Sequence, residues 1–417
     1  MGKYVSIPDS WRSKNYAFEF VEAINKVVVK NILTELRVAS FHTLIVDEST
    51  DITVHKMLIL YFKFRPVNSL LYKTVFGGII QLTACDASAL EAAITQYYTE
   101  HQLDMNRMVM ITSDGASVML GRRKGLAALL KAKVPHLVEQ HCVAHREDLA
   151  LSDAWKDVNL FKNIEVLLRT VYTLFSRSSV KKGALEELAN VHDMDVISFR
   201  PIHEVRWLSR HFAVSAFVRN LDVLAAYCEE QVQDCNDPVC CYILKSLRDP
   251  LYQVALYTVN DVLTELANLS MLLQRSNLSS IEAHQFCISK IRKLEAQYLS
   301  EDVYWNDKAK KILNENVGID TRQITQFIRS VWDHLNVRFP GDELQFWSAF
   351  DHTGLKNCAF EFGVKEIKEL CGKYKDVLQT TNEESIITQY NDFKFQISEK
   401  LKSGSHPALI ASEVLAL

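Results

Sequence analysis

The pattern of apolar and polar residues changes its period near residue 40. Between Phe18 and Leu33 the apolar residues recur at helical spacing, which predicts a helical lead-in segment over residues 1–40. Short apolar runs then follow, each bounded by polar residues or glycine, and such runs are typical of buried strands. Four of them occupy residues 41–46, 57–64, 74–82 and 108–112. A polar turn is predicted to follow the first, over residues 47–51.

Helical spacing returns between and after these strands. Asp86 or Ser88 can cap a helix that runs through Tyr98, and a second helix is predicted over residues 118–130. A fifth strand is predicted near residues 136–141. The order β-β-β-α-β-α-β-α predicts an α/β fold over residues 41–155, with helices on the faces of a mixed sheet.

Beyond residue 155 almost every segment has helical spacing. We expect a large helical insertion over residues 156–350 and a C-terminal return segment, incomplete at its end, over residues 351–417. The clearest helices are predicted at residues 164–175, 214–232, 251–273 and 281–298. With 13 Gly and 8 Pro in 417 residues, the chain has few helix breakers, which agrees with long helices.

Composition excludes several classes of protein. Apolar residues make up 48% of the chain and charged residues 24%, as in soluble globular proteins, and no apolar run is long enough to span a bilayer. The first residues lack the apolar segment of a secretory signal. Nine irregularly spaced cysteines argue against a disulfide framework and for a reducing compartment. We therefore expect a nuclear, or alternatively a cytoplasmic, protein without a membrane partner.

The net charge of −4 limits how this chain could hold nucleic acid. Modules that bind DNA by themselves are usually basic, so DNA binding here requires local patches or another part of a longer protein. The sequence offers three basic patches, at residues 122–124, 177–182 and 200–210. Such patches are also common on ordinary solvated surfaces, so both interpretations stay open.

Two aspartates stand out because each is predicted to close a buried strand. Asp47 follows an apolar Leu-Ile-Val run, and Asp114 follows the strand over residues 108–112. Carboxylates at the ends of adjacent strands can converge, and Mg²⁺ prefers such hard oxygen ligands. Metal ions held in this way can activate a water or a 3′ hydroxyl for attack on a phosphodiester. The alternative is that both aspartates only form turns or cap helices.

Four strings of residues, in their order, resemble successive blocks of the hAT-family DNA transposases. They are most similar to the vertebrate hAT-derived proteins with zinc-finger-type names. The strings are IVDESTD at 45–51, TSDGASVM at 112–119, HCVAHR at 141–146 and RWLS at 206–209. The resemblance extends from about residue 40 to the end of the chain. It implies that the sheet is the first part of an RNase H-like core, which the helical region interrupts and follows.

The resemblance also implies roles for the two aspartates. Asp47 and Asp114 match the first two metal-binding acids of the family's catalytic triad, with Mg²⁺ as the cofactor if the core is active. The third acid, a Glu in a Ser/Cys-Glu-Arg tripeptide, has no match, and the nearest string contains Glu413. We therefore expect an incomplete catalytic core. The chain also ends before the family's C-terminal dimerisation motif, so we expect weak self-association.

Two further pairs have a structural and a functional interpretation. Cys142 and His145 have the spacing of half a zinc site, but no second half is evident, so support of the fold beside the active site is favoured. Arg206 and Trp207 can be a buried aromatic with a cationic neighbour. By the resemblance they can instead stack on an extruded base at a transposon end.

Three functional hypotheses follow. The first is a domesticated, transposase-derived protein that is catalytically inactive and binds DNA or hAT-like protein partners. The second is an active transposase, or a fragment of one, that cleaves DNA with a metal ion. The third is a helical protein-interaction scaffold without a nucleic-acid role. The missing third acid and the acidic net charge favour the first hypothesis.

Overall fold

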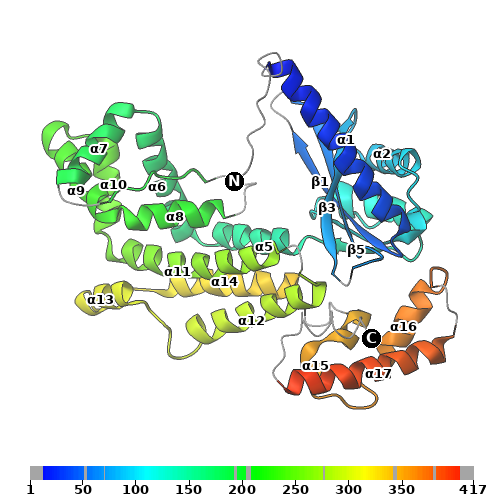
Figure 1. Ribbon diagram of the computed structural model, residues 1–417. Coiled ribbons are helices and arrows are strands. Elements are labelled where there is room, and N and C mark those ends of the chain that lie inside the picture. The colour runs from blue at the N-terminus through cyan, green and yellow to red at the C-terminus, as the bar shows by residue number, and fades with distance from the viewer. Residues whose placement is uncertain are drawn as a thin grey trace, which may run out of the picture. The chain divides into compact units, whose positions relative to one another are not determined.

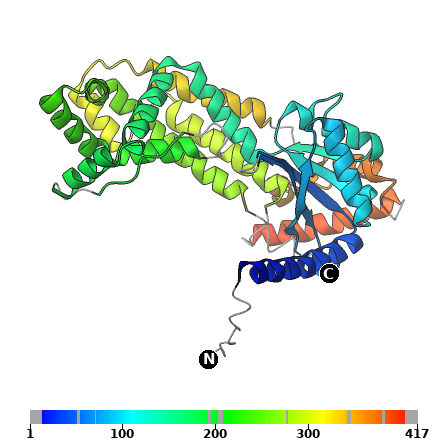
Figure 2. The same ribbon diagram turned by 90° about the horizontal axis from the view of Figure 1, so that it is seen from above.

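A computed structural model describes residues 13–50, 54–69, 71–191, 195–202, 208–275, 278–340, 345–378 and 382–403 (Figures 1 and 2). The chain divides into two compact units. The sheet unit comprises Met1–Cys142 and Gln345–Leu417, and the helical unit comprises Val143–Leu344. In the described part of the chain, no helix is both long enough and apolar enough to cross a membrane.

The sheet unit contains a five-stranded mixed sheet (Figure 1). The strands are β1 (His42–Thr50), β2 (Lys56–Phe64), β3 (Lys73–Leu82), β4 (Met108–Ser113) and β5 (Val138–His141). They lie in the order β3-β2-β1-β4-β5, in which β1, β2 and β3 are antiparallel neighbours and β1, β4 and β5 run parallel. This order is RNase H-like, so the predicted fold class is confirmed.

One face of this sheet carries the core of the unit because side chains alternate between the two faces of a strand. Leu44 and Val46 of β1 pair with Phe62 and Leu60 of β2, and all four are buried. Helix α2 (Ala87–Glu100), capped by Asp86, contributes Leu90 and Ile94 to the same cluster, and α4 (Leu126–Lys133) contributes Leu130. Burying each such side chain contributes roughly 1.5–3 kcal/mol.

The remaining helices of the sheet unit before residue 142 are α1 (Lys14–Val38), the 3₁₀ turn η2 (Met105–Arg107) and α3 (Ser117–Leu120). The single helix predicted over residues 118–130 is wrong, because two short helices, α3 and α4, replace it. Gly121 and Gly125 cause the break: the Gly125 N–H donates to the Gly121 carbonyl over 2.8 Å. A Cβ on Gly125 would lie only 2.4 Å from the Gly121 nitrogen, so only glycine fits.

The second segment of the sheet unit is helical. It contains η3 (Gln345–Phe350), α15 (His352–Lys356), α16 (Val364–Tyr374) and α17 (Glu383–Lys402). The buried Lys394 of α17 donates to the carbonyl oxygens of Phe360 and Phe362, the latter over 3.1 Å. Its ammonium group lies 5.2 Å from the ring of Tyr390, so this cation is held by carbonyls and aromatic faces.

The helical unit contains ten helices among its described residues. They are α5 (Val143–Asp157), α6 (Asn159–Ser176), α7 (Ser179–Val191), α8 (Ser209–Arg219), α9 (Leu221–Cys235), α10 (Pro238–Arg248), α11 (Pro250–Leu273), α12 (Ser280–Tyr298), α13 (Asp307–Glu315) and α14 (Arg322–Arg338). Their buried side chains form one large core cluster. Trp155, Phe161 and Phe327 meet in it, and the rings of Phe161 and Phe327 stack with centroids 3.8 Å apart.

Three of the four predicted helices in this unit are confirmed, as α6, α11 and α12. The helix predicted over residues 214–232 is wrong as one element, because α8 ends and α9 begins at Asn220. The buried Asn220 side chain donates to the Ile197 carbonyl over 2.6 Å and accepts from the Ile197 N–H over 3.1 Å. The amide therefore fastens the preceding segment to the junction of the two helices.

Candidate functional site

Asp47 lies inside the first strand, not after it. β1 continues through Thr50 because residues 47–50 pair with residues 56–59 of β2. The polar turn predicted to begin at residue 47 is therefore wrong over the described residues. Asp47 is exposed, and alternation places it on the face of the sheet opposite to the buried Val46.

Asp114 directly follows the last residue of β4. The parallel pairing of β1 with β4 ends at Ile45 and Thr112, so Asp47 and Asp114 each lie two residues beyond the last paired position. The Asp114 side chain accepts a hydrogen bond from the Ala116 N–H over 3.2 Å, at the start of α3. The two predicted acids are thus brought to the same edge of the sheet, on neighbouring strands.

Glu48 is a third acid at this edge that sequence reasoning missed. It is partly buried, and its Oε1 atom is enclosed without a hydrogen-bond partner. Burial raises the pKa of the Glu48 carboxyl, and the negative charges of Asp114 and Asp47 raise it as well, while Lys56 opposes the shift. The Glu48 carboxyl group therefore interacts electrostatically with both aspartates, although alternation places its side chain on the face opposite to that of Asp47. The only signal in the sequence was the position of Glu48 next to Asp47.

His141 is a second residue that sequence reasoning did not single out. It ends β5, pairs with Ser113, and the following Cys142 N–H donates to the Ser113 carbonyl over 2.8 Å. The His141 ring lies against Gly115, where a Cβ would come within 2.3 Å of the ring. The glycine after Asp114 therefore leaves room for an imidazole beside the acids.

The donor set suits a hard divalent cation only in part. Asp47, Glu48 and Asp114 offer carboxylate oxygens, and the enclosed Oε1 of Glu48 lacks a donor, so a cation such as Mg²⁺ fits the chemistry of this edge. In the described part of the chain, however, no three His, Cys, Asp or Glu side chains are close enough together to hold a metal ion. The carboxyl groups are neighbours, but they do not form a ready-made cage.

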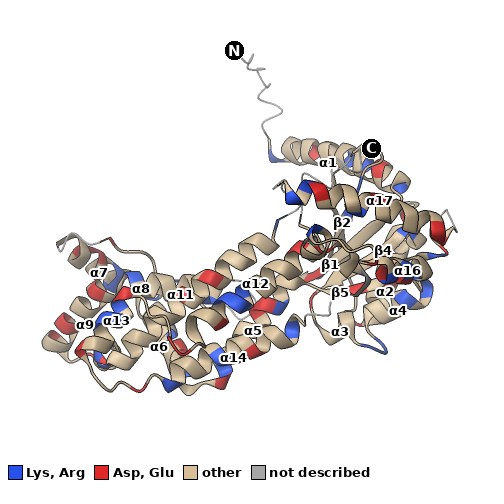
Figure 3. Cartoon of the chain, turned by 90° about the horizontal axis from the view of Figure 1, so that it is seen from below, with Lys and Arg blue, Asp and Glu red and all other residues tan. Residues whose placement is uncertain are grey.

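A basic loop follows the site. Arg122, Arg123 and Lys124 are exposed in the turn between α3 and α4, which the contact between Gly121 and Gly125 closes (Figure 3). Because α3 is only four residues long, these cations come within about ten residues of Asp114 along the chain. We call residues 121–125 the basic loop. The loop presents three exposed cations shortly after Asp114 in the chain.

The remaining predicted residues are not brought into this site. Cys142 is the last residue of the sheet unit, whereas His145 lies in the first turn of α5 in the helical unit. Arg206, Trp207 and Glu413 lie outside the described residues. No third ligand accompanies Cys142 and His145 in the described residues, so the half zinc site gains no support.

The helical unit has a buried charged cluster of its own. Glu147 is only 4% exposed and its Oε2 atom lacks a hydrogen-bond partner. With Asp148, Arg210 and His211 it lines a cavity of about 20 Å³, which has room for about one water molecule. Burial, and then the charge of Asp148, raise the pKa of Glu147 well above its ordinary value. The cavity is too small for a substrate.

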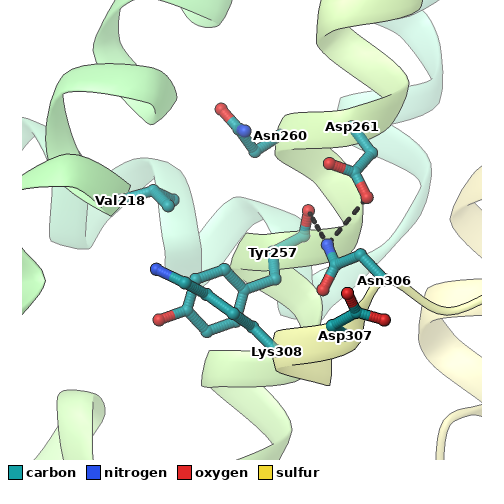
Figure 4. A pocket seen from close by; sticks show the side chains of 7 residues that line it. All are labelled: Val218, Tyr257, Asn260, Asp261, Asn306, Asp307 and Lys308. Atoms are coloured by element: carbon teal, nitrogen blue, oxygen red, sulfur yellow. Dashed lines mark hydrogen bonds between the residues drawn. The ribbon is translucent and has the colours of Figure 1, made fainter. Parts of the chain in front are cut away.

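A larger, open pocket of about 230 Å³ lies between α11 and the start of α13 (Figure 4). The Asn306 amide donates to Asp261 over 2.7 Å and to the Tyr257 carbonyl over 3.4 Å. The Lys308 ammonium group lies 5.2 Å from the centre of the Tyr257 ring. Its polar groups are thus largely engaged with one another. It contains none of the residues that the sequence singled out.

Comparison with known families supports the sheet unit alone. Residues 8–125 match the family model described as "ZMYM1/FAM200, RNase-like domain". The matched segment runs from before α1 to the end of the basic loop and includes Asp47, Glu48 and Asp114. It supports the coarser part of the resemblance, an RNase-like domain of a transposase-derived family. The hAT assignment and the truncated C-terminus stay predictions.

Proposed function

We propose that this chain is a transposase-derived protein that binds DNA through its sheet unit and does not cleave it. One observation supports the absence of cleavage. Asp47 and Asp114 each lie two residues beyond the last pair of neighbouring parallel strands, and Glu48 interacts with both charges, yet no three metal-binding side chains gather within the described residues. Cleavage by the two-metal route needs ligands that hold both ions about 3.5–4 Å apart, and two or three loosely placed carboxylates do not supply them.

The proposed binding surface combines the basic loop with the edge of the sheet that carries Asp47, Glu48 and Asp114, which we call the acidic edge. Arg122, Arg123 and Lys124 supply the cations that contact phosphates, and such contacts position a protein on DNA without reading its sequence. Mg²⁺ at Asp47 and Asp114 would neutralise part of the acidic edge. Binding should therefore be stronger with Mg²⁺ than with a chelator, at equal ionic strength.

The first experiment measures DNA affinity against salt. The triple variant Arg122→Ala, Arg123→Ala, Lys124→Ala should lower the slope of log K against log salt by about 3, one unit for each lost phosphate contact. The control removes the same charge from exposed lysines elsewhere, at Lys156, Lys311 and Lys365. If both triple variants lower the slope equally, only the net charge matters, and the proposed binding surface is refuted.

A second experiment tests the absence of cleavage. The alternative function, an active metal-dependent nuclease, is favoured by the same Asp47 and Asp114 pair. A supercoiled plasmid is incubated with the protein in Mg²⁺ or Mn²⁺, with Asp114→Asn as the matched control. We expect no nicking above the level of the variant. Nicking that depends on Asp114 would overturn the inactive assignment, whereas no salt-dependent retention of DNA would favour the protein-interaction scaffold.

A further inference from the structure

The N-terminal two-thirds of α1 presents apolar side chains to solvent. Seven of them are between 42% and 63% exposed, namely Tyr16, Phe18, Phe20, Val21, Ile24, Val27 and Val28. We call the six other than Phe18 the α1 stripe, because they share one side of the helix. Figure 1 shows this end of the helix extending past the strands.

The α1 stripe is distinct from the side of the helix that packs on the sheet. The C-terminal turns are held by the buried Leu33 and Leu36, with Val29 packed against the same core. At 3.6 residues per turn, these positions lie on nearly the opposite side of the helix from the α1 stripe. The core therefore covers one side of the C-terminal turns, whereas the α1 stripe is exposed, as is Phe18 on the same side of the helix as Leu36.

Because the α1 stripe is not buried, it contributes little to the stability of the helix. Four turns of helix that bury almost nothing are marginal in water, and Val21, Val27 and Val28 have lower helix propensity than unbranched residues. Contiguous exposed apolar surface on a soluble protein usually marks an interaction site. The spacing of Tyr16, Phe20, Ile24 and Val28, each four residues from the next, is that of a helix-packing ridge.

The charges beside the stripe indicate what covers it. Glu19, Lys26 and Lys30 lie along one edge of the stripe, and Lys26 also pairs with Glu22 over 2.7 Å, so the acidic residues of this side precede the basic ones. The other edge carries Lys14 and Asn25. Two antiparallel copies bring the first edge of each helix together, so the Glu19 end of one meets the Lys26–Lys30 end of the other. Two parallel copies would bring the first edge against the second, which offers no carboxylate.

We propose that the α1 stripe binds the α1 stripe of a second copy of this chain, as an antiparallel helix pair. The contact is two-fold symmetric, which is the commonest arrangement of soluble homo-oligomers. It is independent of the proposed DNA binding. It also differs from the C-terminal dimerisation that the resemblance implies for the hAT family, because it uses α1.

The area of the contact sets its strength. Six half-exposed side chains would bury roughly 500 Å² per copy, or roughly 1,000 Å² in all, at the lower limit of specific interfaces. An interface of this size without deep pockets corresponds to a dissociation constant on the order of micromolar. The dimer should therefore form at tens of micromolar and dissociate on dilution.

Sedimentation velocity over 1–100 µM is the first test. We expect a reversible monomer–dimer equilibrium for the full chain, and at least a tenfold weaker association in Ile24→Glu, Val28→Glu. The control places the same substitutions at two other exposed helical valines, Val180→Glu and Val337→Glu, which are 80% and 78% exposed. A chain that stays monomeric at 100 µM, or a dimer weakened equally by both pairs, would overturn the proposal.

The antiparallel orientation is tested with two variants, in each of which two copies of α1 should repel each other. Glu19→Lys makes positions 19, 26 and 30 all positive, and Lys26→Glu, Lys30→Glu makes them all negative, while Glu22 is left unchanged in both variants. Each variant alone should dimerise more weakly than the native chain at low salt, and an equimolar mixture should restore the dimer. Circular dichroism of each variant checks that the helix is retained. A mixture that associates no better than its components would refute the antiparallel pairing.

Discussion

Replacing Glu147 by leucine should stabilise the helical unit. The carboxyl group of Glu147 is buried in α5, and one of its oxygens is enclosed without a hydrogen-bond partner. A buried unsatisfied polar group costs about 1–3 kcal/mol. Leucine has nearly the same volume, and the adjoining cavity of about 20 Å³ leaves room for its branched end. The expected gain in the free energy of unfolding at pH 7 is therefore about 1–3 kcal/mol.

The pH dependence of this effect has a defined sign. Burial raises the pKa of Glu147 well above its ordinary value of 4.5, so the native state holds a proton that the unfolded chain has already released. The native state therefore loses stability as the pH rises above 4.5, by up to about 1.4 kcal/mol per pH unit. Leucine does not titrate. The gain in the variant should be smallest near pH 4 and grow toward neutral pH.

Urea unfolding followed by tryptophan fluorescence at pH 4.5, 6 and 7.5 measures this difference. Trp155 and Trp332 report on the helical unit, because both belong to or pack against its core. Glu187→Leu is the matched control, since Glu187 is an exposed helical glutamate, and surface substitutions usually change stability by less than about 0.5 kcal/mol. A variant at Glu147 that is less stable than the native chain at pH 7.5, or a gain that is equal at all three pH values, would refute the reasoning.

Three further predictions follow from single contacts. The buried His42, whose ring nitrogen lies 2.8 Å from the Tyr98 hydroxyl, has its pKa lowered to about 4 by burial. The sheet unit should therefore lose stability as the pH falls from 6.5 toward 4, and acid titration of His42→Gln should show a smaller loss. Gly363→Ala should destabilise α16 and α17 by at least about 2 kcal/mol in urea melts, because φ is +77° and a Cβ would collide with the Tyr390 hydroxyl. Asp114→Asn should weaken Mg²⁺ binding in calorimetry at least tenfold without lowering the melting temperature by more than about 3 °C, and an unchanged affinity would exclude Asp114 as a ligand.

The positions of the first four strands along the chain could be predicted because each contains a short apolar run. The helix breaks could not, since they depend on contacts between distant or unusual backbone positions. Asn220 ends a helix because its amide bonds Ile197, 23 residues away. Gly121 and Gly125 could have served as a local warning, because two glycines four residues apart are unfavourable inside a helix.

The candidate site was predictable to the extent that it follows from strand register. Asp47 and Asp114 were recognised as acids near the ends of adjacent strands, and β1 and β4 do pair in parallel, with both aspartates just beyond the last paired residues. The end of β1 was misplaced because residues 47–50 are polar, and polar residues can continue a strand when a neighbour such as β2 satisfies their backbone. Extending β1 by four residues is what makes Glu48 part of the sheet.

His141 shows why the rest of the site could not be predicted from the sequence. Its ring reaches Gly115 only because β5 pairs with β4 so that Ser113 and His141 are partners, and no property of the segment around His141 fixes that pairing. The same limit applies to α1. Helical spacing identifies apolar sides, but only packing shows that Leu33 and Leu36 are covered while Ile24 is not. Sequence patterns therefore determine which residues can form a surface, and tertiary contacts determine which of those surfaces are left to bind a partner.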